Sequence, residues 1–256
     1  MLLTLFMLCV ACNTTDTRSI AIVVPYRARP HHLSVFHRYI HHYWKRNFGC
    51  KSLWLLVVEQ NNNEPFNRAA LANVGILEVH NAAKILKLRI DCIVFHDVDL
   101  LPLYGVDYTS CAVPTQLGSE LQHFQWSVPY KKSAGGIVSM SPSDWFKVNG
   151  FSNKYKGWGQ EDDDLYNRLK ANKMLLPNQE IARPAPGHGR FRVIDEGTIH
   201  HPRNRDHLHR KINVNNLFLW SKHPNAWQND GLNSLSYTIN FIKQIQAGMH
   251  IWVTFP

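Results

Sequence analysis

Residues 19–24 read Ser-Ile-Ala-Ile-Val-Val, and Pro25 ends the run. A short apolar, largely β-branched run that stops at a proline predicts a buried strand. The next segment, between Pro30 and Phe48, carries an apolar side chain on each turn of an expected helix. These side chains are Leu33, Phe36, Ile40 and Tyr43. The sequence therefore predicts a strand followed by an amphipathic helix.

The same alternation continues along the chain. Leu53–Val58 is a second apolar run, and a helical stretch from Asn67 to about Leu88, with Gly75 as a candidate break, leads to a third run at Ile90–Phe95. Almost continuously apolar strands that alternate with helices are typical of a parallel sheet covered on both faces. We expect an α/β fold of the doubly wound, nucleotide-binding type, with a mostly parallel central sheet and helices on both faces.

The composition fits one large globular domain. The chain has 256 residues, 45% of them hydrophobic and 18% charged, which is enough to bury a full core. We expect a nucleotide-binding half at residues 18–115 and a second half at residues 116–256. The 28 Lys and Arg against 19 Asp and Glu give a net charge of +9. This surplus suits nucleic acid, a membrane surface or the phosphates of a nucleotide, without choosing among them.

The N-terminus, residues 1–17, begins with an apolar run from Met1 to Cys12 that no charge precedes. A helix needs about 20 apolar residues to span a bilayer, so this run is too short to do so. We interpret it as a leader or as the stub of a truncated anchor. Asn13-Thr14-Thr15 is an N-glycosylation acceptor if the chain enters the secretory route.

Polar side chains follow the first and third predicted strands. They are Tyr26-Arg27-Ala28-Arg29 and His96-Asp97-Val98-Asp99. Sheets of this type bind ligands at the carboxyl ends of their strands. In an extended Asp-x-Asp both carboxylates share a side, so one can take a hard divalent cation while the other takes a sugar hydroxyl. A turn or helix cap is the alternative, and the position after a buried strand favours the metal.

A second acidic stretch, the acidic octet, reads Gly157-Trp158-Gly159-Gln160-Glu161-Asp162-Asp163-Asp164. Its acids open a predicted helix whose apolar face carries Leu165 and Leu169. One or two acids offset the positive end of a helix dipole, whereas further ones repel each other unless a ligand, a metal or a substrate hydroxyl uses them. Trp158 between two glycines is suited to stacking on a sugar or a base. The alternative is an over-charged helix start beside a core tryptophan.

The cysteines do not indicate a zinc site. Among Cys9, Cys12, Cys50, Cys92 and Cys111, only the first two have Cys-x-x-Cys spacing, and no second pair exists. Cys92 and Cys111 bracket Asp97-Val98-Asp99, and two interpretations stay open for them. They form a disulfide in an oxidising compartment, or they are two buried free thiols.

Several of these stretches together resemble the β-1,4-galactosyltransferase family, glycosyltransferase family 7. The stretches occur in the family's order and span about residue 20 to residue 238. They are Phe66-Asn67-Arg68-Ala69, Asp97–Pro102, Gly135-Gly136, Asn149-Gly150-Phe151, the acidic octet and Gly231–Tyr237. The resemblance implies a GT-A glycosyltransferase fold in one compact catalytic domain, with the acceptor and catalytic groups in residues 116–256.

The resemblance also implies roles for individual residues. The donor nucleotide-sugar would be bound by Pro25, Tyr26, Arg27, Arg29, Phe66, Arg68, Asp97, Ser133, Gly136 and Trp158. The acceptor would be bound by Tyr130, Trp158, Asp162 and Asp163. Asp162 would be the general base, with Glu161 and Asp163 on sugar hydroxyls. The metal would be Mn²⁺ on Asp99, His201 and Thr198, and Cys92 and Cys111 fall where the family has a disulfide.

The implied reaction is inverting transfer of galactose from UDP-galactose to the 4-hydroxyl of a terminal N-acetylglucosamine, in the Golgi lumen on a type II membrane protein. Two positions depart from the family. Thr198 replaces the family's methionine, and because a hydroxyl is a harder ligand than a thioether, Mg²⁺ is an alternative to Mn²⁺. Ser133 replaces a tyrosine of galactose-specific members, which leaves UDP-N-acetylgalactosamine as an alternative donor.

Two other classes of protein fit the sequence less well. A catalytically weak glycan-binding relative would be expected to lose the base or the metal acids, and Asp97, Asp99 and Asp162 are all present. A nucleic-acid binder would need aromatic residues among its basic ones, and the basic segment Pro202–Lys211 has none apart from its histidines. We therefore expect no nucleic-acid partner.

Overall fold

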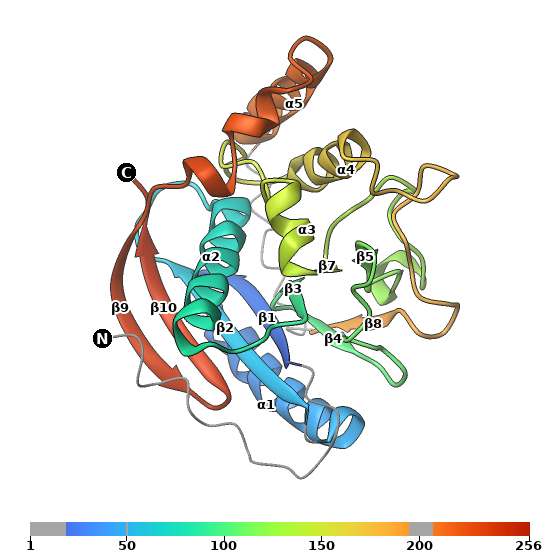
Figure 1. Ribbon diagram of the computed structural model, residues 1–256, viewed down its shortest axis with the longest axis vertical. Helices are drawn as coiled ribbons and strands as arrows, with labels where there is room; N and C mark the ends of the chain where they lie inside the picture. The colour runs from blue at the N-terminus through green and yellow to red at the C-terminus, as the bar shows by residue number, and fades with distance from the viewer. Residues whose placement is uncertain (1–18, 50, 195–206) are drawn as a thin grey trace.

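The computed structural model describes residues 19–49, 51–194 and 207–256. Its centre is a seven-stranded sheet in the order β5-β7-β3-β1-β2-β10-β9 (Figure 1). The strands are β1 (Ser19–Tyr26), β2 (Ser52–Gln60), β3 (Cys92–His96), β5 (Thr115–Gln116), β7 (Ile137–Met140), β9 (Thr238–Ile245) and β10 (Gly248–Thr254). Strands before and after residue 115 thus belong to one sheet.

The expected α/β class is confirmed, and the sheet is mixed. Its four middle strands, β3, β1, β2 and β10, run parallel. On one side β7 pairs antiparallel with β3 and with β5, and on the other β9 pairs antiparallel with β10. The strands β9 and β10 form a hairpin, and a tight turn joins two strands only in the antiparallel sense.

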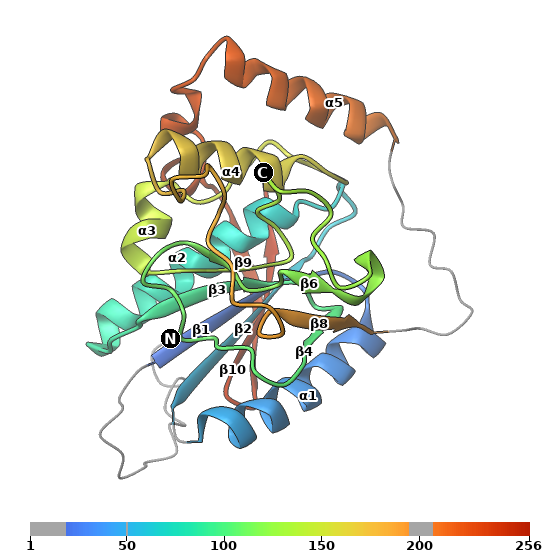
Figure 2. The same cartoon turned by 90° about the vertical axis from the view of Figure 1, so that its right-hand side faces the viewer.

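Helices cover both faces of the sheet, as expected (Figure 2). On one face lies α1 (Pro30–Phe48). On the other lie α2 (Arg68–Leu86), α3 (Pro142–Lys147) and α4 (Glu161–Ala171). Alternate side chains of β1 enter the two cores, Ile20, Ile22 and Val24 on the α1 side and Ala21 and Val23 on the α2 side. All five are fully buried, which explains the continuously apolar run.

The candidate break at Gly75 was wrong, because α2 is one continuous helix. A Cβ atom added at Gly75 would lie 2.2 Å from Cγ1 of Val23 on β1. The glycine therefore lets the helix lie close to the sheet. The helix begins where the Asn67 side chain accepts a hydrogen bond from the backbone N–H of Ala70, and it ends at Lys87, which is left-handed with φ of 54°.

A second, three-stranded sheet was not predicted. It consists of β4 (Leu100–Pro102), β8 (Arg190–Val193) and β6 (Glu120–Leu121). Buried Leu101, Leu121 and Phe191 join it to the core on the α1 side. Strands this short carry no readable alternation. The remaining elements are α5 (His207–Phe218), which lies beside α4, and short 3₁₀ turns η2 (Gln122–Phe124), η3 (Leu219–Ser221), η4 (Ala226–Asn229) and η5 (Leu232–Ser234) (Figure 2).

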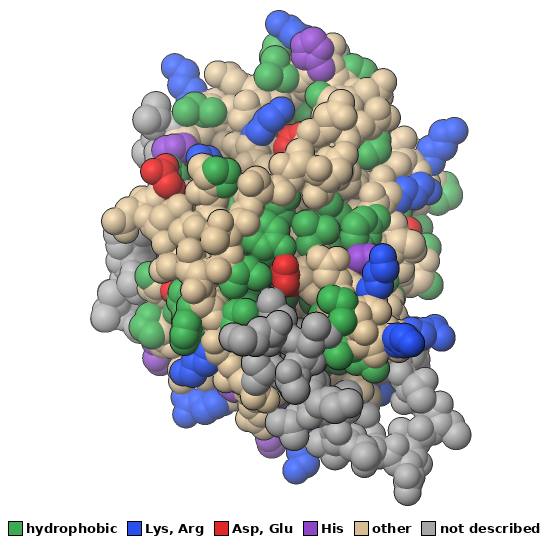
Figure 3. Space-filling view, turned by 60° about the vertical axis from the view of Figure 1, so that its left-hand side comes forward, with side chains coloured by type: hydrophobic (Ala, Val, Ile, Leu, Met, Phe, Trp, Pro, Cys, Tyr) green, Lys and Arg blue, Asp and Glu red, His purple; other side chains and the backbone are tan. Residues whose placement is uncertain are grey.

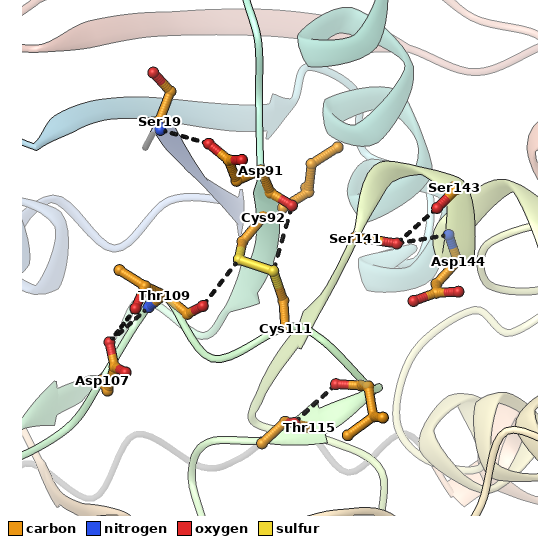
Figure 4. Close-up of a disulfide and its surroundings, with 12 residues drawn as sticks. Ser19, Asp91, Cys92, Asp107, Thr109, Cys111, Thr115, Ser141, Ser143 and Asp144 are labelled. Atoms are coloured by element: carbon orange, nitrogen blue, oxygen red, sulfur yellow. Dashed lines mark hydrogen bonds between the residues drawn. A yellow bond between two sulfur atoms is a disulfide. The ribbon is translucent and has the colours of Figure 1, made fainter. Parts of the chain in front are cut away.

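A disulfide joins Cys92 to Cys111, which confirms the bonded alternative (Figure 4). It connects the first residue of β3 to the loop that leads to β5. Cys92 is 1% and Cys111 7% exposed. Within the described ranges, no helix has the length and apolar character needed to cross a membrane.

Replacing both cysteines with alanine is expected to lower the free energy of unfolding by about 3 kcal/mol, because the bridge restricts a loop whose ends are 19 residues apart. Urea unfolding without reductant measures this difference. Reduced wild-type protein should unfold at the same urea concentration as the variant. A variant as stable as the oxidised wild type would contradict the prediction.

Candidate active site

The Arg68 side chain gathers three of the predicted site acids. Its Nε and Nη2 donate to the two carboxylate oxygens of Asp97 at 2.7 and 2.8 Å. Its Nη1 donates to Glu161 at 2.9 Å and to Asp162 at 3.0 Å. Arg68 begins α2, Asp97 follows β3, and Glu161 and Asp162 begin α4. The two acidic motifs of the sequence therefore meet on one guanidinium.

The surroundings hold that guanidinium in place. The Arg68 side chain is 15% exposed, and its Cζ lies 4.3 Å from the centre of the Phe95 ring. Burial alone would lower the pKa of Arg68, but the charges of Asp97, Asp162 and Glu161 outweigh it and raise the pKa well above its ordinary value. Arg68 is therefore a permanent cation.

Glu161 titrates near neutral pH. Burial and the adjacent Asp162 charge raise its pKa to about 7, although Arg68 acts in the opposite direction. Burial and Asp162 also raise the pKa of Asp163, which shares a hydrogen bond with Tyr130. The Tyr130 pKa is raised in turn by burial and by the charge of Asp163. The protonation of the carboxyl groups at the start of α4 therefore depends on pH and on what binds beside them.

The Glu161 pKa gives a stability prediction. The folded pKa lies above the ordinary 4.5, so the folded state binds this proton more tightly than the unfolded state does. That stabilisation is complete below about pH 4.5 and is lost as the pH rises through about 7. Glu161→Gln keeps the neutral form, so at pH 8 we expect the variant to exceed the wild type by about 3 kcal/mol in unfolding free energy, and to match it near pH 4.5. Urea unfolding at both pH values measures this, and equal stability at pH 8 would contradict it.

The paired glycines form a wall of the site. A Cβ atom at Gly135 would lie 1.9 Å from Oδ2 of Asp162, so this position requires glycine. The carbonyl of Gly136, whose φ is +74°, accepts a hydrogen bond from the backbone N–H of Asp97 at 3.1 Å. Ser133 just before them is 4% exposed. Gly135 and the expected donor residue Gly136 thus contact the acids, whereas the Ser133 hydroxyl contacts Nε2 of Gln116 at 3.5 Å.

The fourth acid of the octet belongs to the core. Asp164 is bonded to Nε of Arg168 at 2.5 Å and accepts from Nε1 of Trp220 at 2.6 Å. Arg168 is fully buried and its Nη1 also donates to the backbone carbonyls of Val148, Asn149 and Gly150. Two arginines of the chain therefore offset the repulsion between the acids of the octet. Arg68 forms ion pairs with Glu161 and Asp162, and Arg168 forms one with Asp164.

The loop after β1 brings the other expected donor residues together. The Tyr26 hydroxyl accepts from the backbone N–H of Arg29 at 2.9 Å, and Arg29 forms an ion pair with Asp99 at 3.1 Å. Arg27 donates to the Glu64 carbonyl at 2.6 Å and lies 5.2 Å from the centre of the Phe66 ring. Pro25 precedes them as part of β1.

Trp158 is 40% exposed and contacts α5. Arg210 of α5 lies 5.1 Å from the centre of its ring, and Nδ2 of Asn213 donates to its carbonyl at 3.3 Å. The backbone N–H of Gly157 donates to the Phe66 carbonyl at 2.8 Å, which ties the octet to the loop before Arg68. An exposed aromatic ring therefore lies three positions before the first acid of α4.

Several sequence predictions are not placed. Thr198 and His201, two of the three expected metal ligands, lie outside the described residues, as do Asn13 and the leader at residues 1–17. Asp99, the third ligand, is described. Among the described residues no group of three or more His, Cys, Asp or Glu side chains gathers as a metal site.

His96 is a structural residue. It is fully buried, its Nε2 lies 2.8 Å from the Tyr108 hydroxyl and its Nδ1 lies 2.8 Å from the Asp97 carbonyl. Burial lowers its pKa to about 4, so it is neutral at physiological pH. Its part in the His96–Asp99 stretch is to orient the backbone that carries the two acids.

Sequence reasoning missed other polar residues around the site. Gln116 donates to the Gly135 carbonyl at 3.1 Å, and its Oε1 accepts from Arg183 at 3.0 Å. His250 and Glu59 pair at 2.8 Å beside Tyr26. No local pattern marks these residues, because each one gains its role from a partner far away in the chain.

The basic side chains on the face shown in Figure 3 are scattered and do not form a continuous stripe. Carboxylates and arginines gather at the carboxyl ends of the parallel strands, where sheets of this type bind nucleotides and other ligands. The fold agrees with such a site. The chain matches the crystal structure of a mutant Drosophila β-1,4-galactosyltransferase 7 in complex with manganese, UDP-Gal and xylobiose with a TM-score of 0.70 and 24% identity, over 94% of this chain and 95% of that one. The fold is therefore GT-A, as expected.

Two family models match the sequence. One describes the N-terminal region of glycosyl transferase group 7 and covers residues 9–112, and the other, described as the N-terminal domain of galactosyltransferase, covers residues 115–195. The chain belongs to glycosyltransferase family 7, the β-1,4-galactosyltransferase family.

Curated relatives agree. The chain is 32% identical to β-1,4-galactosyltransferase 4 of Cricetulus griseus over 240 residues, which is 92% of this chain and 63% of the relative. It is 34% identical to β-1,4-galactosyltransferase 3 of Homo sapiens over 228 residues, which is 86% of this chain and 51% of the relative. The chain thus spans between half and two thirds of the length of these relatives.

Proposed function

We propose that the protein is an inverting galactosyltransferase that moves galactose from UDP-galactose to the 4-hydroxyl of a terminal N-acetylglucosamine on a glycan. The observation that carries this proposal is the position of Asp162. Its carboxylate is fixed between Arg68 and the bare backbone of Gly135, next to Asp97 at the carboxyl end of β3. A base is thereby held where a nucleotide-sugar is expected.

The donor's nucleotide is assigned to the cluster after β1. Arg27, Arg29 and Arg68 supply positive charge for a diphosphate, and the Phe66 ring supplies an apolar face for the base. Arg27 already lies over that ring. Trp158 and the Gly135–Gly136 wall flank the sugar in this assignment, with Tyr130, Asp162 and Asp163 on the acceptor side.

Asp162 has the role of general base. One of its oxygens accepts a hydrogen bond from Arg68, so the carboxylate has a fixed orientation. It takes the proton of the acceptor hydroxyl as that oxygen attacks the anomeric carbon from the face opposite UDP. A single displacement inverts the configuration. Glu161 and Asp163, both with raised pKa values, then bind sugar hydroxyls.

The residues fit a hard divalent cation. The Asp99 side chain is 33% exposed and offers carboxylate oxygens, the ligands that Mn²⁺ and Mg²⁺ prefer, and among the described residues Arg29 is its ion-pair partner. We assign Mn²⁺ to Asp99 with His201 and Thr198, and Mg²⁺ is the alternative. When bound, the ion neutralises negative charge on the departing diphosphate.

The donor and acceptor of this chain are part of the proposal. The small Ser133 leaves UDP-N-acetylgalactosamine as an alternative donor, because its side chain is short where galactose-specific members of the family carry a tyrosine. The relatives are named galactosyltransferases, and the Drosophila structure holds UDP-Gal and xylobiose. We also propose a Golgi location on the lumenal side, with the membrane reached through an N-terminal anchor.

A glycan-binding protein with weak turnover is the second candidate. The observation that favours it is the ion pair between Arg68 and Asp162. This ion pair occupies one oxygen of the carboxylate that would have to accept the proton of the acceptor hydroxyl.

One experiment separates the two candidates. UDP release by the full chain is measured with Mn²⁺ and N-acetylglucosamine, with UDP-galactose and UDP-N-acetylgalactosamine in parallel. Turnover that depends on the acceptor supports the transferase, and the ratio of the two rates identifies the donor. Folded protein that binds UDP but releases none with N-acetylglucosamine or xylose acceptors would overturn the transferase and support the glycan-binding candidate.

A further inference from the structure

The helix α1 has an unusual composition for a helix outside the active site. Its sequence, PHHLSVFHRYIHHYWKRNF, contains five histidines and no acidic residue. His37 and His41 lie one turn apart on the same side, and their ring centres are 4.7 Å apart. Both rings are half-buried against the turn that joins β9 to β10.

The two rings lie beside one backbone carbonyl. Nε2 of His41 lies 2.8 Å from the carbonyl oxygen of Gln246, and the same carbonyl opposes the lowering of the His37 pKa although Nε2 of His37 forms no hydrogen bond to it. In the part of the chain that the structure describes, Nε2 of His37 is buried and has no hydrogen-bond partner. A buried polar atom without a partner is costly, and an ion or a water molecule is one of its ordinary explanations.

The charge state of the rings suits a metal ligand. Burial lowers the pKa of His37, and burial together with His37 lowers the pKa of His41. Both imidazoles are therefore neutral at pH 7 and above, the form that coordinates metal ions. Two histidines spaced i, i+4 on a helix can reach the same ion, as in the His-Glu-x-x-His motif.

We propose that His37 and His41, with the Gln246 carbonyl, bind a Zn²⁺ ion that ties α1 to the β9–β10 turn. Neutral imidazoles suit Zn²⁺ and similar borderline metals, whereas Mn²⁺ and Mg²⁺ take carboxylate oxygens, which α1 does not offer. Water completes the four-coordinate shell. With two side-chain ligands the affinity is modest, and the site is independent of the proposed transferase reaction.

The experiment is a Zn²⁺ titration of the full chain followed by thermal unfolding. At about 100 times the Kd, the wild-type Tm should rise by about 5–10 °C. His37→Ala and His41→Gln should lose most of this rise, and the glutamine retains a donor for the Gln246 carbonyl. His42→Ala, which removes an exposed histidine from the same helix, is the matched control and should respond like the wild type. The Tm rise with Mn²⁺ should be the same in all four proteins.

A direct measurement accompanies it. Diffraction from zinc-soaked crystals at the zinc edge should give an anomalous peak between the two rings. A Zn²⁺-dependent Tm rise that is unchanged in His37→Ala and His41→Gln would overturn the proposal, and so would zinc peaks only elsewhere in the molecule.

Discussion

Replacing Asp162 with asparagine is expected to lower kcat by about 100- to 10,000-fold while UDP binding stays close to that of the wild type. Asparagine has nearly the same shape, so it still fits against Gly135 and still accepts a hydrogen bond from Arg68. It cannot take the proton of the acceptor hydroxyl. Steady-state rates and calorimetric titration with UDP measure the two quantities separately.

The matched control for this variant is Asp107→Asn, which changes an exposed acid in the loop after β4 in the same way. It should keep the wild-type kcat. An Asp162→Asn protein with the wild-type kcat would remove Asp162 from the role of general base. Weak UDP binding in that variant would instead assign Asp162 a part in holding the donor.

The second large effect concerns stability. Arg168→Leu is expected to lower the free energy of unfolding by about 3–5 kcal/mol, because it leaves Asp164 charged, buried and without its ion-pair partner. The same change removes the donor to the carbonyls of Val148, Asn149 and Gly150. Urea unfolding of the variant measures the loss.

Lys170→Leu is the control for that experiment, since Lys170 is an exposed residue of the same helix and should shift stability by only about 0.5 kcal/mol. The double variant Asp164→Leu with Arg168→Leu should recover part of the loss, because it also removes the buried Asp164 charge. Asp230, which lies 3.8 Å from Nη2 of Arg168, keeps its hydrogen bonds with Ser152 and Asn153. An Arg168→Leu protein that loses less than the Lys170→Leu protein would contradict the buried role of the ion pair.

The first half of the fold was predictable because each of its elements is long and apolar on the sides that are buried. The strand runs at β1, β2 and β3 and the helices α1 and α2 were all expected within a few residues of their bounds. The short strands β4, β5, β6 and β8 were not, because two to four residues cannot show a period. The antiparallel edges of the sheet depend on pairing that a local pattern does not carry.

The site was predictable as a set of residues but not as a network. The acids and arginines were expected from the two acidic motifs and from the family resemblance. The contact of Arg68 with Glu161 joins residues 93 positions apart, and no local rule announces it. For the same reason the sequence did not distinguish the buried Asp164, which pairs with Arg168, from Glu161 and Asp162, which pair with Arg68. The four acids are adjacent and chemically alike, and their roles depend on the residues that the fold places beside them.

The order of the central sheet has a consequence for biosynthesis. The last strand, β10, lies between β2 and β9, and its Met249, Ile251 and Val253 are buried. Until the ribosome has released these residues, β2 has an open edge and the core on the α2 side is incomplete. We therefore expect folding to finish only after residues 248–256 have left the ribosome. A stop codon that removes residues 248–256 should yield an aggregating chain despite an intact set of acidic site residues.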